Sequence, residues 1–286
     1  MSKAVVFGAS GQLGQCLQAL AANRVSITDI VFLPEEAADI LDEEKLQKVF
    51  EEHTPAFCIN CAAYTAVDKA EKETALASRI NKDGVENLSR LCHTYGTTLI
   101  HISTDFVFSG ETNVPLVETD ETAPLNVYGQ TKLAGEKVIS TYIPYYFILR
   151  TSWLYSEFGN NFVKTMLRLG KEREELKVIW DQAGTPTYAM DLAACILTLI
   201  ETNSTAYGTY HYSNEGLTSW YDFAHAIFEL SGTAVKVIPV RTSEYVTDAV
   251  RPAYSVMDKS KIKKALNLEI PYWRESLARC VSQLTK

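Results

Sequence analysis

The chain has 286 residues and a formal net charge of −8, a length that suits one large or two modest domains with a substantial core. The acidic balance and the lack of a basic stretch exclude binding to the phosphate backbone of nucleic acids. No stretch comes near the roughly 18 consecutive apolar residues that a membrane-spanning helix needs, so the sequence predicts no contact with a membrane.

The start of the chain and its cysteines both indicate a cytoplasmic protein. Met1-Ser2-Lys3 runs directly into an apolar segment, so we expect no signal peptide. The six cysteines are scattered along the chain, and Cys58 and Cys61 fall in a strand-like run where residues three apart point to opposite faces. We therefore expect reduced, buried cysteines, and neither a metal site nor a redox pair from these two.

A glycine-rich turn follows the first predicted strand. The apolar run Ala4 to Phe7 is typical of a strand buried on both faces of a parallel sheet, and Gly8, Gly11 and Gly14 follow it at the start of a helical pattern. Glycines in this place permit a tight turn and close approach of the backbone to a pyrophosphate. The helix N-terminus adds N–H donors and positive potential. The sequence therefore predicts a dinucleotide site, although the spacing is G-x-x-G-x-x-G rather than G-x-G-x-x-G.

The second predicted strand, residues 27–33, ends in Pro34 without an acidic residue. The carboxylate that usually binds the adenosine ribose is therefore displaced or missing, and the sequence does not separate NADH from NADPH. Two interpretations of Asp39 remain open, a contact with the adenine side of the cofactor and a solvated loop carboxylate. Asp42 is expected to cap the helix that follows.

Strands and helices continue to alternate up to Arg150. A strand at 56–61 leads into the small residues 62–63, and a strand at 98–103, after a helix at 74–95, delivers Thr104 to the same sheet edge, where open α/β sheets bind ligands. The long loop 106–126 is expected to be functional. The alternation predicts an α/β fold, with residues 1–150 forming a Rossmann-like doubly wound parallel sheet that binds the dinucleotide.

Tyr128 and Lys132 form the most informative pair in the chain. Residues four apart on a helix share a face, and a helix is predicted from Tyr128 to about Thr141. A free phenol has a pKa of about 10, and a neighbouring cation favours its ionised form, so we expect Lys132 to lower the pKa of Tyr128. The Thr104 hydroxyl is placed to hold a substrate oxygen nearby. The alternative interpretation is an exposed helix start with an ordinary tyrosine and lysine.

The second half of the chain is less regular. Helices are predicted near 160–172, 189–201, 219–230 and 272–284, with short strands near 209–212 and 235–239. We expect residues 151–286 to form mainly a smaller substrate-binding lobe over the cofactor cleft, with some segments returning to the Rossmann sheet.

The glycine turn, Thr104, Tyr128 and Lys132 together resemble the extended short-chain dehydrogenase/reductase family, and the resemblance covers nearly the full chain. Within the family, the chain is similar to the reductases that convert the C4 keto group of dTDP-4-dehydro-6-deoxy-L-mannose and so give dTDP-L-rhamnose. The resemblance implies an NADPH- or NADH-dependent oxidoreductase of polysaccharide biosynthesis that acts on a nucleotide sugar. Its most specific segments are residues 60–71, 103–108 and 181–187, and Arg251-Pro252 with Ser255 and Asp258.

The resemblance also implies roles for individual residues. Tyr128 would donate the proton, Lys132 would hold the nicotinamide ribose and tune Tyr128, and Thr104 would orient the sugar carbonyl. Hydride delivery to a ketone leaves an alkoxide that a positioned acid must protonate, which agrees with these roles. The sugar would contact Thr104, Asp105 and Trp153. The dinucleotide would be lined by Gly11, Gln12, Leu13, Asp39, Ile40, Ala62, Ala63 and Tyr64.

The chain departs from the family pattern at two positions. Gln15 stands where some members have an acidic residue that binds magnesium at a dimer interface, so we expect no metal and leave a homodimer as a possibility. Tyr254 stands where an asparagine is common, which affects the substrate lobe.

Three other functions are compatible with parts of the sequence. The related 4,6-dehydratases carry Asp-Glu after the threonine, whereas Asp105 is followed here by Phe106, which argues against dehydration. Another sugar-nucleotide reductase or epimerase of the same family remains an alternative. So does a non-catalytic, cofactor-binding regulatory subunit, against which the intact Thr104, Tyr128 and Lys132 argue.

Arg251 has two interpretations. An arginine fork pairs two phosphate oxygens at once, and the following proline restricts the backbone of Arg251 to extended conformations, so Arg251 is a candidate for the substrate diphosphate. The alternative is a structural ion pair with a carboxylate such as Asp248 or Asp258.

Overall fold

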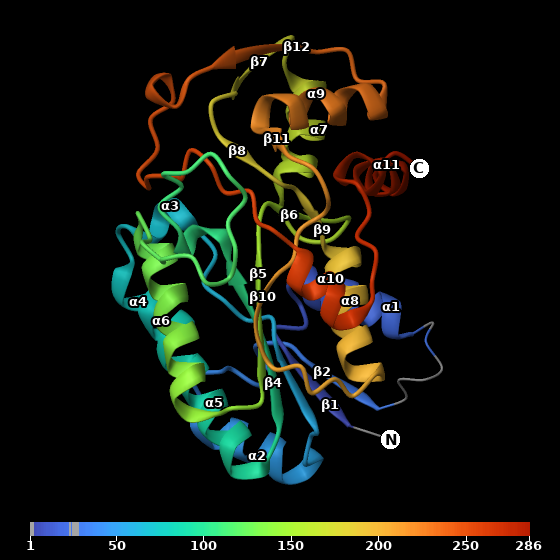
Figure 1. Ribbon diagram of the computed structural model, residues 1–286. Coiled ribbons are helices and arrows are strands. Elements are labelled where there is room, and N and C mark those ends of the chain that lie inside the picture. The colour runs from blue at the N-terminus through green and yellow to red at the C-terminus, as the bar shows by residue number, and fades with distance from the viewer. Residues whose placement is uncertain (1–2, 23, 25–28) are drawn as a thin grey trace.

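A six-stranded parallel sheet forms the centre of the protein in the computed structural model, which describes residues 3–22, 24 and 29–286 (Figure 1). The strand order is β2-β1-β3-β4-β5-β10, with every neighbouring pair parallel. This doubly wound arrangement confirms the predicted fold class. The second strand begins at Ile30, and the predicted residues 27 and 28 lie outside the described residues. The strands are β1 (Ala4–Phe7), β2 (Ile30–Leu33), β3 (Phe57–Asn60), β4 (Thr98–Thr104), β5 (Tyr146–Thr151) and β10 (Gly208–His211).

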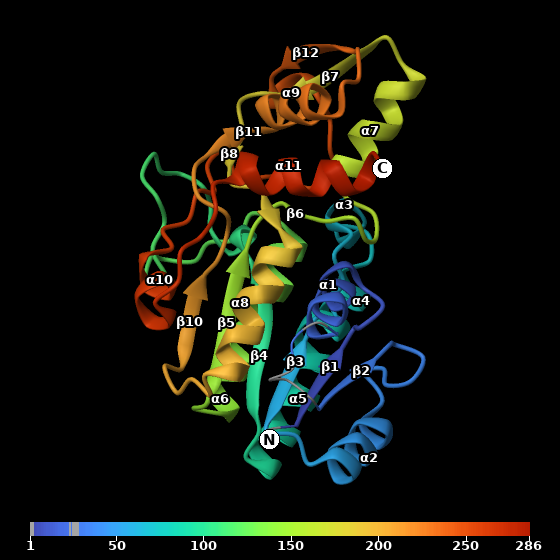
Figure 2. The ribbon, with the colours of Figure 1, turned by 90° about the vertical axis from the view of Figure 1, so that its right-hand side faces the viewer.

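Helices cover both faces of this sheet, as Figures 1 and 2 show. Successive residues of β1 enter opposite cores, Ala4 and Val6 on one side and Val5 and Phe7 on the other, because side chains alternate across a strand. The Val5 face is covered by α2 (Glu43–His53), α5 (Gly84–Tyr95) and α6 (Val127–Tyr142), and the other face by α1 (Gln12–Ala21), α8 (Ala189–Glu201) and α10 (Ser260–Leu266). Asp42 caps α2, as predicted, by accepting from Lys45 N at 3.0 Å.

The predicted helix 74–95 contains an irregular turn. Its first part, α4 (Thr74–Ser78), joins α5 through a π-helical segment at Arg79–Asp83. Asn81, buried within that segment, bonds the backbone of Tyr64 and the Thr131 hydroxyl of α6. The turn thus ties the loop after β3 to α6, and such bulges are frequent near functional sites.

The remaining segments build a smaller lobe over the upper ends of the central strands (Figure 1). Its core is rich in aromatic side chains, among them Tyr155, Phe223 and Trp273. The two-residue strands and α10 were not predicted, because such short elements carry no readable period. The lobe contains β6 (Leu154–Tyr155), α7 (Phe162–Glu172), β7 (Glu175–Ile179), β8 (Ala183–Gly184), β9 (Thr187–Tyr188), β11 (Thr218–Ser219), α9 (Trp220–Ser231), β12 (Lys236–Val240) and α11 (Trp273–Leu284).

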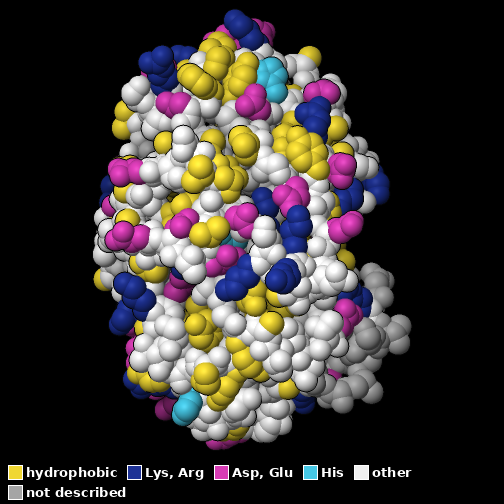
Figure 3. All heavy atoms as spheres, viewed as in Figure 1, with side chains coloured by type: hydrophobic (Ala, Val, Ile, Leu, Met, Phe, Trp, Pro, Cys, Tyr) yellow, Lys and Arg dark blue, Asp and Glu magenta, His cyan; other side chains and the backbone are white. Residues whose placement is uncertain are grey.

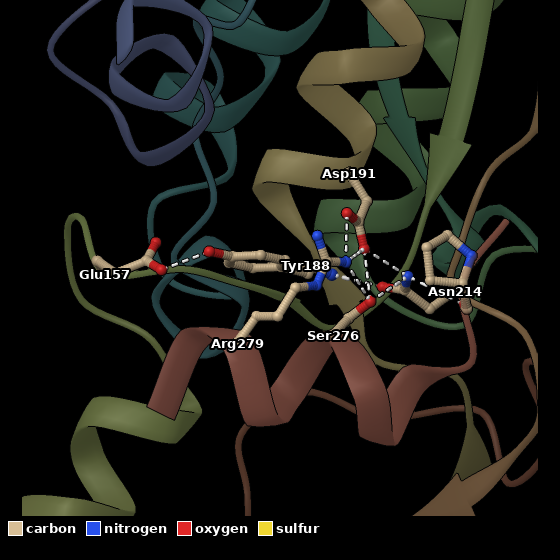
Figure 4. Close-up of polar contacts among 7 residues, drawn as sticks. Glu157, Tyr188, Asp191, Asn214, Ser276 and Arg279 are labelled. Carbon is tan, nitrogen blue, oxygen red and sulfur yellow. Dashed lines mark hydrogen bonds and ion pairs between the residues drawn. The ribbon is translucent and has the colours of Figure 1, made fainter. Parts of the chain in front are cut away.

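A buried polar network fastens this lobe to the sheet layer (Figure 4). Asp191 of α8 accepts hydrogen bonds from Arg279 at 2.6 Å and Ser276 at 2.6 Å, both on α11, and from Asn214 at 2.8 Å. Asp191 is 8% exposed, and a buried carboxylate is tolerated only when its oxygens are paired in this way. The network fixes α11 across the end of α8.

Candidate functional site

A cleft of about 720 Å³ lies at the carboxyl ends of the central strands. β1 is flanked by β2 and β3, so the strand order reverses there, and open α/β sheets bind ligands at this switch point. The cleft brings together loops that are far apart in the sequence. Of the predicted site residues, it is lined by Gly11, Gln12, Leu13, Ala62, Ala63, Thr104, Asp105, Tyr128, Lys132, Trp153 and Arg251.

The other predicted cofactor residues do not line this cleft. Gly8 and Gly14 serve packing, because a Cβ on either would come within 2.6 Å of the backbone of Ala62 or Ala9. The side chains of the remaining three, Asp39, Ile40 and Tyr64, bond or pack elsewhere: Asp39 accepts from Leu41 N at 2.9 Å, Ile40 is buried against Gly84, and the Tyr64 hydroxyl donates to Glu73 at 2.6 Å.

The first turn of α1 fits the diphosphate of a dinucleotide. Gly11 is its N-cap without a side-chain cap, and the first turn contains no acidic residue, so its N–H groups and positive potential face the cleft uncompensated. The Gln12 side chain reaches the second lobe, donating to Leu154 O at 3.2 Å and accepting from Asn161 at 2.8 Å. Gln12 therefore connects the glycine-rich loop before α1 to that lobe.

Thr104 and Asp105 lie at the end of β4. The Thr104 hydroxyl accepts from Phe106 N at 3.1 Å and donates to Asp105 Oδ1 at 3.0 Å. Burial raises the pKa of the Asp105 carboxyl to about 6. Its second oxygen, Oδ2, is buried, and Ser255, which interacts with the carboxyl, opposes the rise in this pKa.

Local sequence places Tyr128 beside these two residues. Asn126 caps α6 by accepting from Gly129 N at 2.8 Å. A Cβ at position 129 would lie 2.2 Å from Phe106 O, so only glycine lets the start of α6 pack against the turn after β4. Phe106 and Tyr128 then meet edge to face with ring centroids 5.9 Å apart.

The electrostatics of Tyr128 differ from the expectation. Burial raises the pKa of Tyr128 to about 12, with the Asp105 carboxylate adding to the rise and a hydrogen bond with Thr104 opposing it. The Lys132 ammonium donates to Ile102 O at 2.6 Å and lies 3.3 Å from His101 Nε2, and burial lowers its pKa to about 8. The prediction that Lys132 lowers the pKa of Tyr128 is wrong for the free protein, because burial dominates and Lys132 contacts β4. Tyr128 therefore keeps its proton at neutral pH.

Trp153 forms one wall of the cleft together with Trp220. Their rings stack with centroids 3.6 Å apart and planes at 11°. Trp153 has a positive φ of 47°, a strained conformation of the kind that clusters at functional sites. Gly184 makes room for its ring, since a Cβ there would lie 2.7 Å from it. Trp220 was not predicted, and its place at the start of α9 gives no sequence signal of a site.

Arg251 lies at the cleft with a carboxylate partner other than those expected. Its guanidinium pairs with both oxygens of Asp68, at 2.6 and 3.1 Å, and this contact holds the pKa of Asp68 below its usual range. The expected partners are engaged elsewhere, Asp248 with Lys72 at 2.6 Å and Asp258 with Ser260 N at 2.7 Å. Sequence reasoning also missed Asn60, the last residue of β3, which lines the cleft.

Other features of the described residues bear on possible partners. They contain no group of three or more His, Cys, Asp or Glu that could hold a metal ion, and all six cysteines are free. None of the helices in the described part of the chain is both long and apolar enough to cross a membrane. On the face shown in Figure 3, basic and acidic side chains are interspersed without a broad basic area.

Comparison with known proteins shows the family of the chain. The family model described as the RmlD substrate binding domain matches residues 2–286. The chain is 42% identical to a dTDP-4-dehydrorhamnose reductase of Escherichia coli (strain K12), with 98% of this chain and 97% of the relative covered. It is 43% identical to the dTDP-4-dehydrorhamnose reductase of Bacillus anthracis solved in complex with NADP, with a TM-score of 0.94 and 99% of each chain covered. A dTDP-4-dehydrorhamnose reductase from Clostridium acetobutylicum is 42% identical, with a TM-score of 0.94 over 99% of this chain and 100% of that one.

Proposed function

The chain belongs to the RmlD family of dTDP-4-dehydrorhamnose reductases, and we propose that it reduces the C4 keto group of dTDP-4-dehydro-6-deoxy-L-mannose to give dTDP-L-rhamnose. The family makes it an NAD(P)H-dependent oxidoreductase. One observation carries the proposal for this substrate and these residues: Tyr128, Thr104, Asp105 and Lys132 line one cleft with an uncapped helix N-terminus.

Tyr128 is the proposed proton donor. When bound, the reduced nicotinamide cofactor supplies a hydride to the carbonyl carbon. A phenol whose pKa is raised to about 12 is fully protonated at neutral pH and donates its O–H to the carbonyl oxygen as negative charge develops there. Thr104, which interacts with Tyr128, orients the same oxygen.

The cofactor is held by the first loop and by α6 in this proposal. The backbone N–H groups of Gly11, Gln12 and Leu13 receive the diphosphate at the start of α1. Lys132 binds the nicotinamide ribose. A relative of this chain was solved with NADP, and we propose that this chain takes NADPH and also NADH.

The sugar nucleotide occupies the rest of the cleft. Thr104 and Asp105 line the part of the cleft where the sugar binds in this proposal. Trp153, stacked on Trp220, forms the wall against the sugar, and Arg251 receives the diphosphate. Residues 1–150 thus bind mainly the dinucleotide and 151–286 mainly the substrate, while α8 and β10 pack with the sheet.

A turnover assay tests the proposed reaction. The purified protein with NADPH is mixed with dTDP-4-dehydro-6-deoxy-L-mannose, and loss of the reduced cofactor is followed by absorbance while the product is identified by mass spectrometry and NMR. We expect one dTDP-L-rhamnose per NADPH consumed, and no oxidation with dTDP-glucose, which lacks the ketone. Cofactor binding without oxidation would support the regulatory-subunit alternative, and a higher kcat/KM with another keto-sugar nucleotide would support a different reductase.

A further inference from the structure

Three polar side chains, two from the central sheet and one from α6, are buried in a row between the sheet and this helix. Asn60 is 1% exposed, His101 is 0% exposed and Lys132 is 2% exposed. The parallel register of β3 and β4 pairs Asn60 with His101, so their side chains lie next to each other. Lys132 approaches the far side of the His101 ring from α6. The imidazole therefore connects the end of β3 to the lysine of the site.

The direction of the hydrogen bonds in this row follows from one backbone amide. Ala62 N lies 3.0 Å from an amide atom of Asn60, and a backbone N–H can only donate, so that atom is the carbonyl oxygen. The Asn60 NH₂ group consequently faces His101 Nδ1, at 3.2 Å. Because NH₂ also only donates, Nδ1 must accept, and the neutral ring carries its proton on Nε2.

His101 thus directs an N–H group at Lys132. Nε2 is 3.3 Å from Lys132 Nζ, and an ammonium offers donors only. The two groups form a hydrogen bond only when Lys132 is a neutral amine with a free lone pair. Lys132 still donates to Ile102 O at 2.6 Å in that state.

The other charged or titratable groups around Lys132 do not offset this donor. Glu136, one turn further along α6, favours the ammonium, but it accepts from Arg150 at 2.7 Å and from Ser103 at 2.5 Å. Cys61, after β3, also favours the ammonium, and burial outweighs both. Tyr128 lies one turn before Lys132 on α6.

We propose that Asn60 and His101 are positioning residues of the reductase site: they present an N–H donor to Lys132, which disfavours its ammonium form and leaves Tyr128 the last of the two groups to lose its proton. The role rests on the proposed function in one respect, that Tyr128 is the proton donor. Burial raises the pKa of Tyr128 to about 12 and lowers that of Lys132 to about 8, which reverses their ordinary order, and the N–H group of His101 acts on Lys132 in the same direction as burial.

Nitrogen NMR on the free wild-type protein tests the tautomer directly. The protein is labelled with ¹⁵N-histidine and ¹⁵N-lysine, and the ring nitrogens of His101 and Nζ of Lys132 are followed against pH. We expect a neutral His101 with its proton on Nε2 across the neutral range, and a Lys132 midpoint near 8. A proton on Nδ1, or a Lys132 midpoint at the ordinary lysine value of about 10.4, overturns the proposal.

One substitution should reverse the direction of the hydrogen bonds that join residue 60, His101 and Lys132. In Asn60→Asp the carboxylate still accepts from Ala62 N but now also accepts from His101, so the ring proton moves to Nδ1 and Nε2 becomes an acceptor for the Lys132 ammonium. We expect the Lys132 midpoint to rise by at least about one pH unit. Asn81→Asp is the matched control, because Asn81 is equally buried against α6 but bonds Tyr64 and Thr131 rather than His101.

We expect Asn81→Asp to leave the His101 proton on Nε2. If Asn60→Asp also leaves it there, or if both substitutions move it alike, the proposal is wrong. The measurement on the wild-type protein shows which ring nitrogen of His101 carries the proton even if a variant does not fold. All these measurements use the free protein without sugar nucleotide. A chain that passes them and yet oxidises no NADPH with the keto sugar contradicts the proposed reaction and not the hydrogen-bond row.

Discussion

Two buried cations lie close to α6 and are held in opposite ways. Arg150 of β5 forms a two-pronged ion pair with Glu136 at 2.7 and 3.0 Å, both side chains being 6% exposed, and Ser103 adds a hydrogen bond to the same carboxylate. Lys132, one turn away from Glu136, contacts a backbone carbonyl and an imidazole instead. None of the ion pairs among the described residues includes Lys132.

The difference indicates that Arg150 stabilises the fold, whereas Lys132 serves the proposed reaction. A buried charge with a matched partner is stable where it is, and removing either partner leaves an uncompensated charge. A buried charge without such a partner shifts its pKa instead, as Lys132 does. The fold therefore retains at Lys132 a cation that burial disfavours, beside the group that we propose donates the proton.

The largest expected effect is on turnover, when the proposed proton donor near Lys132 is removed. Tyr128→Phe removes one hydroxyl and should lower kcat by about 10² to 10⁴-fold, while cofactor affinity and melting temperature stay close to wild type. Tyr142→Phe is the matched control on the same helix, because its hydroxyl bonds Glu86 rather than facing the cleft. Wild-type turnover in the Tyr128 variant would show that the proton comes from another group.

Glu136→Ala removes the ion pair that holds the other buried cation, Arg150. Arg150 would remain buried without its carboxylate, and the free energy of unfolding should fall by about 3 to 5 kcal/mol in urea denaturation. Glu172→Ala removes the partner of Arg168 in an exposed helical pair and should cost at most about 0.5 kcal/mol. If the free energy of unfolding fell by the same amount in the two variants, burial would not determine how much these ion pairs stabilise the protein.

Arg251 combines the two situations, because it forms an ion pair with Asp68 and also lines the cleft. If it receives the substrate diphosphate, Arg251→Ala should raise KM for the sugar nucleotide about tenfold, the loss of one charge-assisted contact, with little change in melting temperature. Asp68→Ala breaks the same ion pair but leaves the arginine in place, so KM should rise less. A lower melting temperature in both variants with KM unchanged would make the pair purely structural.

The smallest expected difference is between the two cofactors. β2 ends at Leu33, and Pro34 follows without a carboxylate that would repel a 2′-phosphate. The kcat/KM values for NADPH and NADH should therefore agree within about 100-fold, or roughly 3 kcal/mol. Pro34→Asp adds the missing carboxylate and should shift the preference toward NADH, whereas a strong preference in the wild type would contradict the expectation.

Much of the site could be predicted because its residues follow parallel strands or share one helix face. Thr104 ends β4, and Tyr128 and Lys132 are four apart on α6, so local spacing and sheet topology bring them to one edge. The same reasoning gave the doubly wound sheet and the cap at Asp42. These features depend on contacts between neighbours in the sequence or on the general rules of open α/β sheets.

The features that were missed depend on distant contacts. Arg251 pairs with Asp68, 183 positions away, and Trp153 stacks on Trp220, which no periodicity reveals. The direction of the Tyr128 pKa depends on how deeply its hydroxyl is buried and on what Lys132 contacts instead, and a sequence gives neither. Burial of a polar group is decided by the assembled core.

The most direct test of the contrast between the two cations is the free energy of unfolding of Lys132→Met as a function of pH. The pKa of Lys132 falls from an ordinary 10.5 to about 8 in the folded protein, so the folded state binds this proton less tightly than the unfolded chain, and the wild type loses stability as pH falls through that interval. At pH 7 the substitution removes this penalty of about 3 kcal/mol, but it also removes the hydrogen bond from Nζ to Ile102 O, whose loss costs the same at every pH. The stability of Lys132→Met relative to wild type should therefore be about 3 kcal/mol more favourable at pH 7 than above pH 10.5, while turnover is lost. A stability difference between the two proteins that stays the same from pH 7 to above pH 10.5 would show that the fold holds this cation as firmly as it holds Arg150, and would contradict the account.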